Sequence, residues 1–399
     1  MGSRHYERPP TPSRAFLESV ARELLGRGKL VPDLDARATE IQHMYRTDKP
    51  GLAEYNLEDC RLVSEIFEYA DLIRFAIARS RMTGLELDRP GGSVAAFDFL
   101  YLPRLHRAGY VAPVVRADAA AGGPGGYVLD SKPGLYEHVV VLDFKSLYPS
   151  IIRTFNVDPL AMIEAGGEDD PVPGFNGASF SRHRFILPHL IESLWAARDT
   201  AKRNGNAPLS QAIKIIMNSF YGVLGTPGCR FFDPRLVSSI TLRGHEILQQ
   251  TRDLIEARGY TVIYGDTDSV FVLLEGVPPE KVDETGTTLI QELNVWWRNH
   301  LSDTVGVESC LEMEFETHFE KFLMPRIRGS EEGSKKRYAG TSTDDGKPRL
   351  VFKGLETVRS DWSALARDFQ QQLYWRIFMD EPYESFVQET VDAVAERGA

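Results

Sequence analysis

The feature that most constrains this chain is a short acidic turn between two apolar runs. Residues 260–264 and 269–274 are rich in β-branched and aromatic side chains, and the segment from Gly265 to Asp268 separates them. This pattern predicts a β-hairpin, with Gly265 giving the backbone freedom on entry to the turn. The carboxylates of Asp266 and Asp268 repel each other unless solvent or a divalent cation neutralises them, and hard oxygen ligands suit magnesium. A solvated turn and a magnesium site both remain open.

A second acid follows an apolar run elsewhere in the chain. Residues 139–142 form a continuous apolar run of the kind found in buried strands, and Asp143 comes directly after it. Pro149 is compatible with the first turn of a helix, so we expect Leu147 and Tyr148 to lie in the turn between strand and helix. An acid followed by a backbone turn and an aromatic residue, together with a second acidic turn, favours a polyphosphate site.

Two helices are predicted between these acidic stretches. Residues 186–204 and 209–224 carry apolar side chains at helical spacing and are joined by a short turn, which indicates an antiparallel helical hairpin. The polar residues that helical spacing places on common faces are Arg198 and Lys202 on the first helix, and Lys214, Asn218 and Tyr221 on the second. A solvated hairpin and a ligand-binding hairpin are equal alternatives at this point.

Other elements are predicted from periodicity alone. We expect one long helix over residues 52–78, helices over 236–258, 289–300 and 362–395, a strand with one acidic face over 311–316, and a loop over 329–347. Tyr55 and Asp59 share a face near the start of the first of these helices. The Gly- and Pro-rich residues 112–134 predict a domain boundary.

Composition and charge narrow the class of protein. No secretory leader pattern and no membrane-spanning apolar run is found in the 399 residues, so we expect a cytoplasmic protein with no membrane partner. The formal net charge of −11 argues mildly against binding nucleic acid through the overall field. Locally, however, residues 321–353 carry nine basic and four acidic side chains, which suits contact with phosphate.

Three stretches taken together resemble the three polymerase motifs of family B DNA polymerases, in the order of that family. They are Asp143-x-x-Ser-Leu-Tyr-Pro-Ser, Lys214-x-x-x-Asn-Ser-x-Tyr-Gly and Tyr264-Gly-Asp-Thr-Asp-Ser. Flanking segments such as residues 229–235 and 354–359 are similar to bacterial members of the family. The resemblance implies an α+β fold, in which an antiparallel sheet with helices forms the palm and an antiparallel pair of helices forms the fingers.

The resemblance also implies a domain order. We expect a remnant of an exonuclease domain with connecting helices over residues 1–111, the first part of the palm over 112–181, the fingers over 182–225, the second part of the palm over 226–359, and the start of a truncated thumb over 360–399. Tyr55 and Asp59 match the last exonuclease motif, whereas the earlier exonuclease acids have no counterpart. No 3′–5′ exonuclease activity is therefore expected from this chain.

The catalytic residues that the resemblance implies are Asp143 and Asp268, with Asp266 assisting from outside the metal-binding pair. Asp143, Asp268 and the backbone of Phe144 are expected to hold two Mg²⁺ ions, for which Mn²⁺ can substitute, in a two-metal phosphoryl transfer. The backbone from Phe144 to Leu147 is expected to add amide donors or a carbonyl.

The remaining assignments concern nucleotide and DNA. The residues expected to bind the incoming nucleotide are Arg198, Lys202, Lys214, Asn218, Leu147, Tyr148 and Tyr221. The ring of Tyr148 is expected to collide with a 2′-hydroxyl and so to select deoxynucleotides. The residues expected to contact DNA are Gly126, Tyr127, Lys335, Lys336, Arg337 and Tyr338, although a packed aromatic is an equal alternative for Tyr338.

The implied partners are primer–template DNA and deoxynucleoside triphosphates, and the implied setting is DNA repair or replication restart in the bacterial cytosol or nucleoid. A sliding clamp, or a second chain supplying the missing exonuclease and thumb parts, is a further option. Two other functions stay open. One is a catalytically incomplete fragment that acts as a DNA-binding or assembly module, and the other is a two-metal nuclease or phosphatase, which needs neither Tyr148 nor the Lys214 face.

Overall fold

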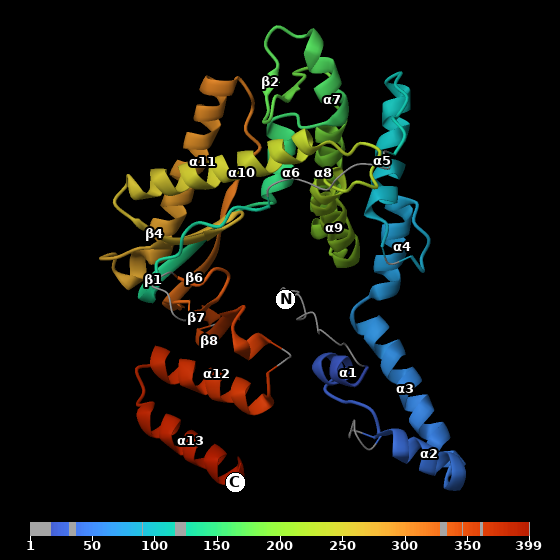
Figure 1. Ribbon diagram of the computed structural model, residues 1–399, viewed down its shortest axis with the longest axis vertical. Coiled ribbons are helices and arrows are strands. Elements are labelled where there is room, and N and C mark those ends of the chain that lie inside the picture. The colour runs from blue at the N-terminus through green and yellow to red at the C-terminus, as the bar shows by residue number, and fades with distance from the viewer. Residues whose placement is uncertain are drawn as a thin grey trace. The chain divides into compact units, whose positions relative to one another are not determined.

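The structure is a computed structural model that describes residues 17–31, 37–89, 91–115, 125–327, 333–344, 346–359 and 362–398 (Figure 1). Two compact units divide the chain, one formed by Met1–Pro90 with Arg198–Ile213 and the other by Gly91–Ala197 with Lys214–Ala399. The division crosses two consecutive helices, α8 (Leu187–Arg203) and α9 (Ala207–Leu224). These helices confirm the helical pair predicted from the sequence.

The first unit begins with four helices in its described residues, α1 (Leu17–Leu25), α2 (Arg37–Thr47), α3 (Lys49–Tyr69) and α4 (Leu72–Thr83). The prediction of one helix over residues 52–78 is wrong. Asp71 has a left-handed φ of 51° and separates α3 from α4. A left-handed residue cannot continue a right-handed helix, so the apolar periodicity runs across a real break.

The second unit contains a six-stranded antiparallel sheet of order β4-β5-β1-β6-β7-β8. Its strands are β1 (Gly134–Phe144), β4 (Thr261–Asp266), β5 (Ser269–Leu273), β6 (Met313–Met324), β7 (Tyr338–Asp344) and β8 (Lys347–Lys353). A separate small sheet pairs β2 (Val172–Pro173) with β3 (Ser179–Phe180). The mixed helix and antiparallel-sheet fold confirms the predicted α+β class.

The remaining helices are α5 (Ser93–Arg107), α6 (Leu147–Thr154), α7 (Pro159–Glu164), α10 (Pro234–Glu256), α11 (Val282–Val305), α12 (Ala364–Phe378) and α13 (Glu384–Gly398), with short 3₁₀ turns at Ala165–Gly167, Pro279–Lys281 and Glu356–Val358.

Two long helices pack on one face of the large sheet. Helix α10 contacts β4 and β5, and α11 contacts β1 and β6. Trp297 on α11 donates a hydrogen bond of 3.1 Å to the buried hydroxyl of Thr251 on α10, which joins the two helices.

The other face of the sheet carries a hydrophobic cluster. Val139 and Val141 of β1 pack there with Tyr264, Phe271 and the phenylalanines of β6. Side chains two residues apart on a strand share a face, so Asp143 continues the row of Val139 and Val141 on this side. The sheet face that carries this apolar cluster therefore ends in an acidic residue, Asp143.

Four predictions for the C-terminal part are corrected by the structure. The predicted loop at residues 329–347 contains β7 and the start of β8, with the turn between them passing through Gly346 at a φ of 75°. Helix α11 and strand β6 extend well beyond the predicted residues 289–300 and 311–316. The helix predicted over residues 362–395 is two helices, because Asp380 has a left-handed φ of 55° between α12 and α13.

Part of the prediction falls outside the described residues. Of the boundary predicted at residues 112–134, residues 116–124 are not described, and of the loop predicted at 329–347, residues 329–332 and 345 are not described. Within the described part of the chain, no helix is both long and apolar enough to cross a membrane.

Candidate active site

Three neighbouring strands bring the predicted acids together. Asp143 of β1 lies opposite Ser269 of β5, and Ser269 lies opposite Asp266 of β4. The amide of Phe144 donates a hydrogen bond of 2.8 Å to the carbonyl of Asp268, so the acidic turn is tied directly to the strand end that carries Asp143. The prediction that these distant sequence segments face one another is confirmed.

The turn itself depends on Thr267 and not on Gly265. Thr267 has a left-handed φ of 60°, and the amide of Asp268 donates to the carbonyl of Asp266 at 2.7 Å across it. Gly265 lies inside β4, where a Cβ atom would come within 2.6 Å of the side chain of Leu129. The predicted role of Gly265 in loosening the turn is therefore wrong, since its missing side chain makes room for Leu129.

Helix α6 starts earlier than predicted. Ser146, with a left-handed φ of 49°, precedes the helix, and Leu147 is its first residue. Leu147 and Tyr148 thus lie in the first helical turn and not in the connection before it. Pro149 is the third helical residue, where the missing N–H costs no intrahelical hydrogen bond.

The first two backbone amides after Asp143 already form hydrogen bonds within the protein. The amides of Phe144 and Lys145 donate to the carbonyls of Asp268 and Glu312 at 2.8 and 2.9 Å. Neither amide is therefore free to donate to a bound phosphate, and the expected contribution of the other backbone groups from Phe144 to Leu147 stays a prediction.

Mutual repulsion and burial dominate the electrostatics of the acids. Burial, followed by the charges of Asp268, Glu316 and Glu314, raises the pKa of Asp143 to about 8, while Lys214 acts in the opposite direction. Burial, with the charges of Asp266 and Glu316, raises the pKa of Asp268 to about 6. The protein thus holds these carboxylates close together without enough positive charge to balance them.

Strand β6 supplies two acids that the sequence reasoning did not assign to the site. Glu314 lies opposite Asp143, and the register between β1 and β6 shifts so that Glu316 has no partner on β1. Such a bulge redirects a side chain, and it places the charge of Glu316 close enough to act on both Asp143 and Asp268. The alternating Glu residues of the strand were the available signal. Lys145 balances part of this charge through ion pairs of 3.2 Å to Glu312 and 3.1 Å to Glu314.

The donor set fits magnesium better than a metal held by the protein alone. Among the residues that the structure describes, no three His, Cys, Asp or Glu side chains come together closely enough to hold a metal ion. Magnesium is usually bound by one or two carboxylates together with substrate phosphates and water. Two carboxylates with raised pKa values are suited to that arrangement, because burial and repulsion both disfavour their charged forms and a divalent cation offsets the repulsion.

Two residues of helix α9 lie near the motif around Asp143. Lys214 and Asn218 are exposed and Tyr221 is half-buried, as expected for a shared face. The ring centroid of Tyr221 lies 4.5 Å from that of Tyr148, and the positive charge of Lys214 partly opposes the rise in the pKa of Asp143. Lys214 and Tyr221 are thus brought together with the motif around Asp143. Arg198 and Lys202 lie on the part of α8 that belongs to the first unit.

Residues 335–338 lie against the same hairpin. The amide of Lys336 donates to the hydroxyl of Tyr264 at 2.9 Å, and its ammonium lies 3.5 Å from Asp266. Lys335 lies 3.9 Å from Asp130, and Arg337 forms an ion pair with Glu356. The ring of Tyr338 contacts Phe271, Phe319 and Phe322, so this tyrosine packs into the hydrophobic cluster.

The sequence model of DNA polymerase family B matches residues 91–398. This chain belongs to DNA polymerase family B. It is 56% identical over 380 residues to DNA polymerase II of Escherichia coli K12, a match that covers 94% of this chain and 48% of that protein. It is 28% identical over 382 residues to a DNA polymerase of Thermococcus gorgonarius, covering 90% of this chain and 46% of that protein.

A further relative is the DNA polymerase alpha catalytic subunit of Arabidopsis thaliana, with 34% identity over 61% of this chain and 15% of that subunit. The family predicted from the three motifs is confirmed, and so is the likeness to a bacterial member. The chain spans about half the length of the bacterial and archaeal relatives.

The first unit of this family B chain holds the other predicted acid. The ammonium of Lys29 lies 2.6 Å from a carboxylate oxygen of Asp59 and 3.4 Å from the hydroxyl of Tyr55. Burial lowers the pKa of Lys29, but the hydrogen bonds with Asp59 and Tyr55 outweigh it, so the pKa of Lys29 is raised and the ammonium form is favoured. Tyr55 and Asp59 do share a helix face, and Lys29 occupies it.

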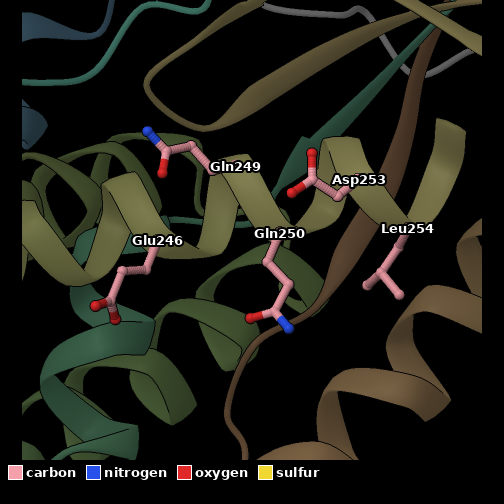
Figure 2. A pocket seen from close by; sticks show the side chains of 5 residues that line it. All are labelled: Glu246, Gln249, Gln250, Asp253 and Leu254. Atoms are coloured by element: carbon pink, nitrogen blue, oxygen red, sulfur yellow. The ribbon is translucent and has the colours of Figure 1, made fainter. Parts of the chain in front are cut away.

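A surface pocket of this family B chain lies apart from the motif residues. Figure 2 shows it along α10, lined by Glu246, Gln249, Gln250, Asp253 and Leu254. None of these five side chains belongs to the three polymerase motifs. The candidate active site is therefore the carboxylate cluster at the end of β1 and β4–β5.

Proposed function

We propose that this chain catalyses the template-directed addition of deoxynucleotides to the 3′ end of a DNA primer. The observation that supports this most is the hydrogen bond between the amide of Phe144 and the carbonyl of Asp268. It joins the first and third polymerase motifs, so that Asp143 and Asp268 lie on adjacent strand ends. In a phosphoryl transfer the protein mainly positions the reacting groups and neutralises charge. The hydrogen bond between Phe144 and Asp268 would hold the two aspartates in position for this.

The carboxylates of Asp143 and Asp268, with the carbonyl of Phe144, would hold two Mg²⁺ ions, for which Mn²⁺ can substitute. When bound, the ions supply positive charge to the attacking and leaving oxygens of the transfer. Asp266 has a different task in this proposal. Its carboxylate accepts a hydrogen bond of 3.1 Å from Thr267 and lies 3.5 Å from the ammonium of Lys336, so it stabilises the turn beside the pair.

Lys214 and Asn218 would bind the triphosphate of the incoming nucleotide from α9, together with Arg198 and Lys202 of α8. Charge-assisted hydrogen bonds from lysine and arginine to phosphate are among the stronger polar contacts. Leu147 and Tyr148 begin α6 next to the acids, and the ring of Tyr221 lies against that of Tyr148. We propose that Tyr148 lies beneath the sugar and excludes a 2′-hydroxyl, with Tyr221 near the new base pair.

Lys335, Lys336 and Arg337 would contact the primer–template duplex, together with Gly126 and Tyr127. Tyr338 contributes by packing beneath this segment rather than by reaching the DNA. In this proposal the sheet and its helices form the palm, α8 and α9 form the fingers, and α12 and α13 begin the thumb. The proposed setting is DNA repair or replication restart in the bacterial cytosol or nucleoid. A clamp or a second chain remains a proposed partner.

Primer extension by the isolated chain tests the function. A 5′-labelled primer on templates that differ only at the first unpaired base is incubated with Mg²⁺ and one deoxynucleotide at a time. We expect one-nucleotide extension only with the complementary nucleotide. Tight primer–template binding with no extension would instead favour the DNA-binding module, and cleavage of the labelled primer would favour a two-metal nuclease.

A further inference from the structure

A short segment of the second unit runs along the outer edge of the acidic hairpin. We call residues 125–132 the strap. Leu129 and Lys132 donate backbone hydrogen bonds of 2.9 and 2.8 Å to the carbonyls of Gly265 and Ile263 on β4, and Val128 forms a bridge with Asp266. The strap therefore covers the free edge of β4 as far as the acidic turn.

At the turn, the strap holds the one residue with an unfavourable backbone conformation. The amide of Thr267 donates a hydrogen bond of 2.8 Å to the carbonyl of Tyr127. Thr267 is β-branched and has a φ of 60°, an unfavourable conformation for such a residue that persists only where neighbouring structure enforces it. The Tyr127 carbonyl is a neighbour that can enforce it.

Close approach of the strap depends on Gly126. A Cβ atom at this position would lie 2.6 Å from the Thr267 hydroxyl and 3.3 Å from the hydroxyl of Tyr148. The first distance is too short for any real contact, so only glycine allows the strap to pass this close to both side chains. Gly126 thus touches the turn of the third motif and the tyrosine of the first motif at once.

His245 of α10 fixes the strap from the other side. Its Nε2 lies 2.8 Å from the carbonyl of Gly125, and because a carbonyl only accepts, Nε2 carries the proton. Its ring centroid also lies 5.0 Å from that of Tyr127. The preceding residue, Gly244, faces the Tyr148 ring, where a Cβ atom would lie 3.5 Å from Cε1. Helix α10 therefore supports both the strap and Tyr148.

We propose that the strap is a positioning element of the active site and that His245 is the positioning residue that anchors it. It keeps Thr267 in its left-handed conformation, and the turn in turn presents Asp268 to Asp143. This inference rests on the proposed polymerase function, and it gives Gly126 and Tyr127 a task in addition to the proposed DNA contact.

The size of the effect follows from the geometry of the turn. The carbonyl of Asp268 accepts a hydrogen bond from the amide of Phe144, and the amide of Asp268 donates one to the carbonyl of Asp266. A change at Thr267 therefore moves the backbone of Asp268. A misplacement of 1 Å in a catalytic group costs on the order of 100-fold in rate. Loss of one anchoring hydrogen bond should have a smaller effect than a direct clash.

The first test compares His245→Leu with His245→Gln. Glutamine retains an N–H donor for the Gly125 carbonyl, whereas leucine does not. In single-turnover incorporation of one nucleotide, we expect His245→Leu to be about tenfold slower and His245→Gln to stay within about twofold of the wild type. The dissociation constant for primer–template DNA, measured by fluorescence anisotropy, should change less than about twofold in both.

The second test is a rescue at the point of closest approach. Gly126→Ala should slow incorporation about 100-fold. Thr267→Ala removes both Thr267 atoms that the new methyl group would meet, so the double variant should be no more than about threefold slower than Thr267→Ala alone. An additive loss in the double variant, or a Gly126→Ala effect confined to DNA affinity, would overturn the proposal in favour of a role in DNA contact alone.

The third test needs no enzymatic activity. Hydrogen exchange of the Thr267 amide is followed by NMR in the threonine-labelled chain, with Thr267→Ala identifying the signal. We expect His245→Leu to reduce protection of this amide at least about tenfold and His245→Gln to preserve it. Unchanged protection in His245→Leu would show that His245 does not hold the turn. A chain that adds no nucleotide would overturn the polymerase function, while this measurement would still decide the role of the strap.

Discussion

Each compact unit holds acids that were predicted to belong to polymerase-family motifs, and the two places differ in how the acidic charge is balanced. In the second unit, Asp143 and Asp268 lie at adjacent strand ends, and burial together with repulsion from neighbouring carboxylates raises their pKa values to about 8 and about 6. In the first unit, Asp59 accepts a hydrogen bond of 2.6 Å from the Lys29 ammonium. Among the described residues, no ammonium or guanidinium group forms an ion pair with Asp143 or Asp268, whereas Asp59 is paired with Lys29.

This difference indicates that an acid in a matching sequence motif is not by itself enough to form a metal site. Carboxylates attract a divalent ion when the surrounding protein leaves their charge unbalanced, as it does around Asp143. An ammonium held against Asp59 competes directly with such an ion. We therefore expect metal-dependent chemistry at the cluster of the second unit and a structural ion pair at that of the first.

The largest expected effect is the loss of either central aspartate. Asp143→Ala or Asp268→Ala should lower single-nucleotide incorporation by at least ~1,000-fold, because several kcal/mol of charge stabilisation depend on the metal pair. Asp59→Ala is the matched control and should stay within about twofold. Circular dichroism should show an intact fold in each variant. Near-normal incorporation by Asp268→Ala would remove the two-metal assignment.

The next effect separates nucleotide binding from DNA binding. Lys214→Ala should weaken use of the incoming nucleotide roughly 10- to 100-fold, the range for losing a charged hydrogen bond, with little change in DNA affinity. Replacing both Lys335 and Lys336 by alanine should do the reverse and reduce the salt dependence of DNA binding by about one unit of slope for each lost phosphate contact. Equal effects of both changes on both measurements would contradict this division.

A smaller effect is expected on sugar selection. Tyr148→Ala should retain deoxynucleotide incorporation and lower the discrimination against ribonucleotides by at least about tenfold, because removing the ring opens space for the 2′-hydroxyl. The measurement is the ratio of kcat/KM for matched deoxy- and ribonucleotides, with Tyr221→Phe as the control. An unchanged ratio would mean that Tyr148 serves packing alone.

The smallest effect concerns the cluster of the first unit. Lys29→Met should destabilise the chain by about 1–2 kcal/mol, because it leaves the partly buried Asp59 carboxylate without its partner. Thermal unfolding measures the loss, and adding Asp59→Asn should recover most of it. No variant of this cluster should shorten a 3′-mismatched primer in the presence of Mg²⁺. Shortening by the wild-type chain would show a working exonuclease site.

The central acids could be predicted from the sequence because their signals are local. An apolar strand delivers Asp143, a hairpin turn carries Asp266 and Asp268, and antiparallel pairing then joins them. The helical hairpin was equally local. These parts of the fold and site needed no knowledge of distant contacts.

The missed features depend on contacts between segments far apart in the chain. Gly265 lacks a side chain because Leu129 fills the space where one would lie. A bulge in the pairing with β1 sets the position of Glu316, and an ion pair with Lys29 balances the charge of Asp59. The break between α3 and α4 rests on a left-handed Asp71, a conformation that the apolar periodicity does not reveal. Periodicity records which residues are apolar, and it does not record which distant residue approaches.

The most direct test of the account is the Mg²⁺ dependence of single-nucleotide incorporation at pH 6, 7 and 8. Asp143 and Asp268, with pKa values of about 8 and about 6, must lose protons to bind the ions, so metal competes with protons throughout this range. The account predicts that the half-saturating Mg²⁺ concentration falls by about tenfold or more from pH 6 to pH 8, equally in the wild type and in Asp59→Asn. A half-saturating concentration that does not change with pH, or a pH dependence that disappears in Asp59→Asn, would contradict it.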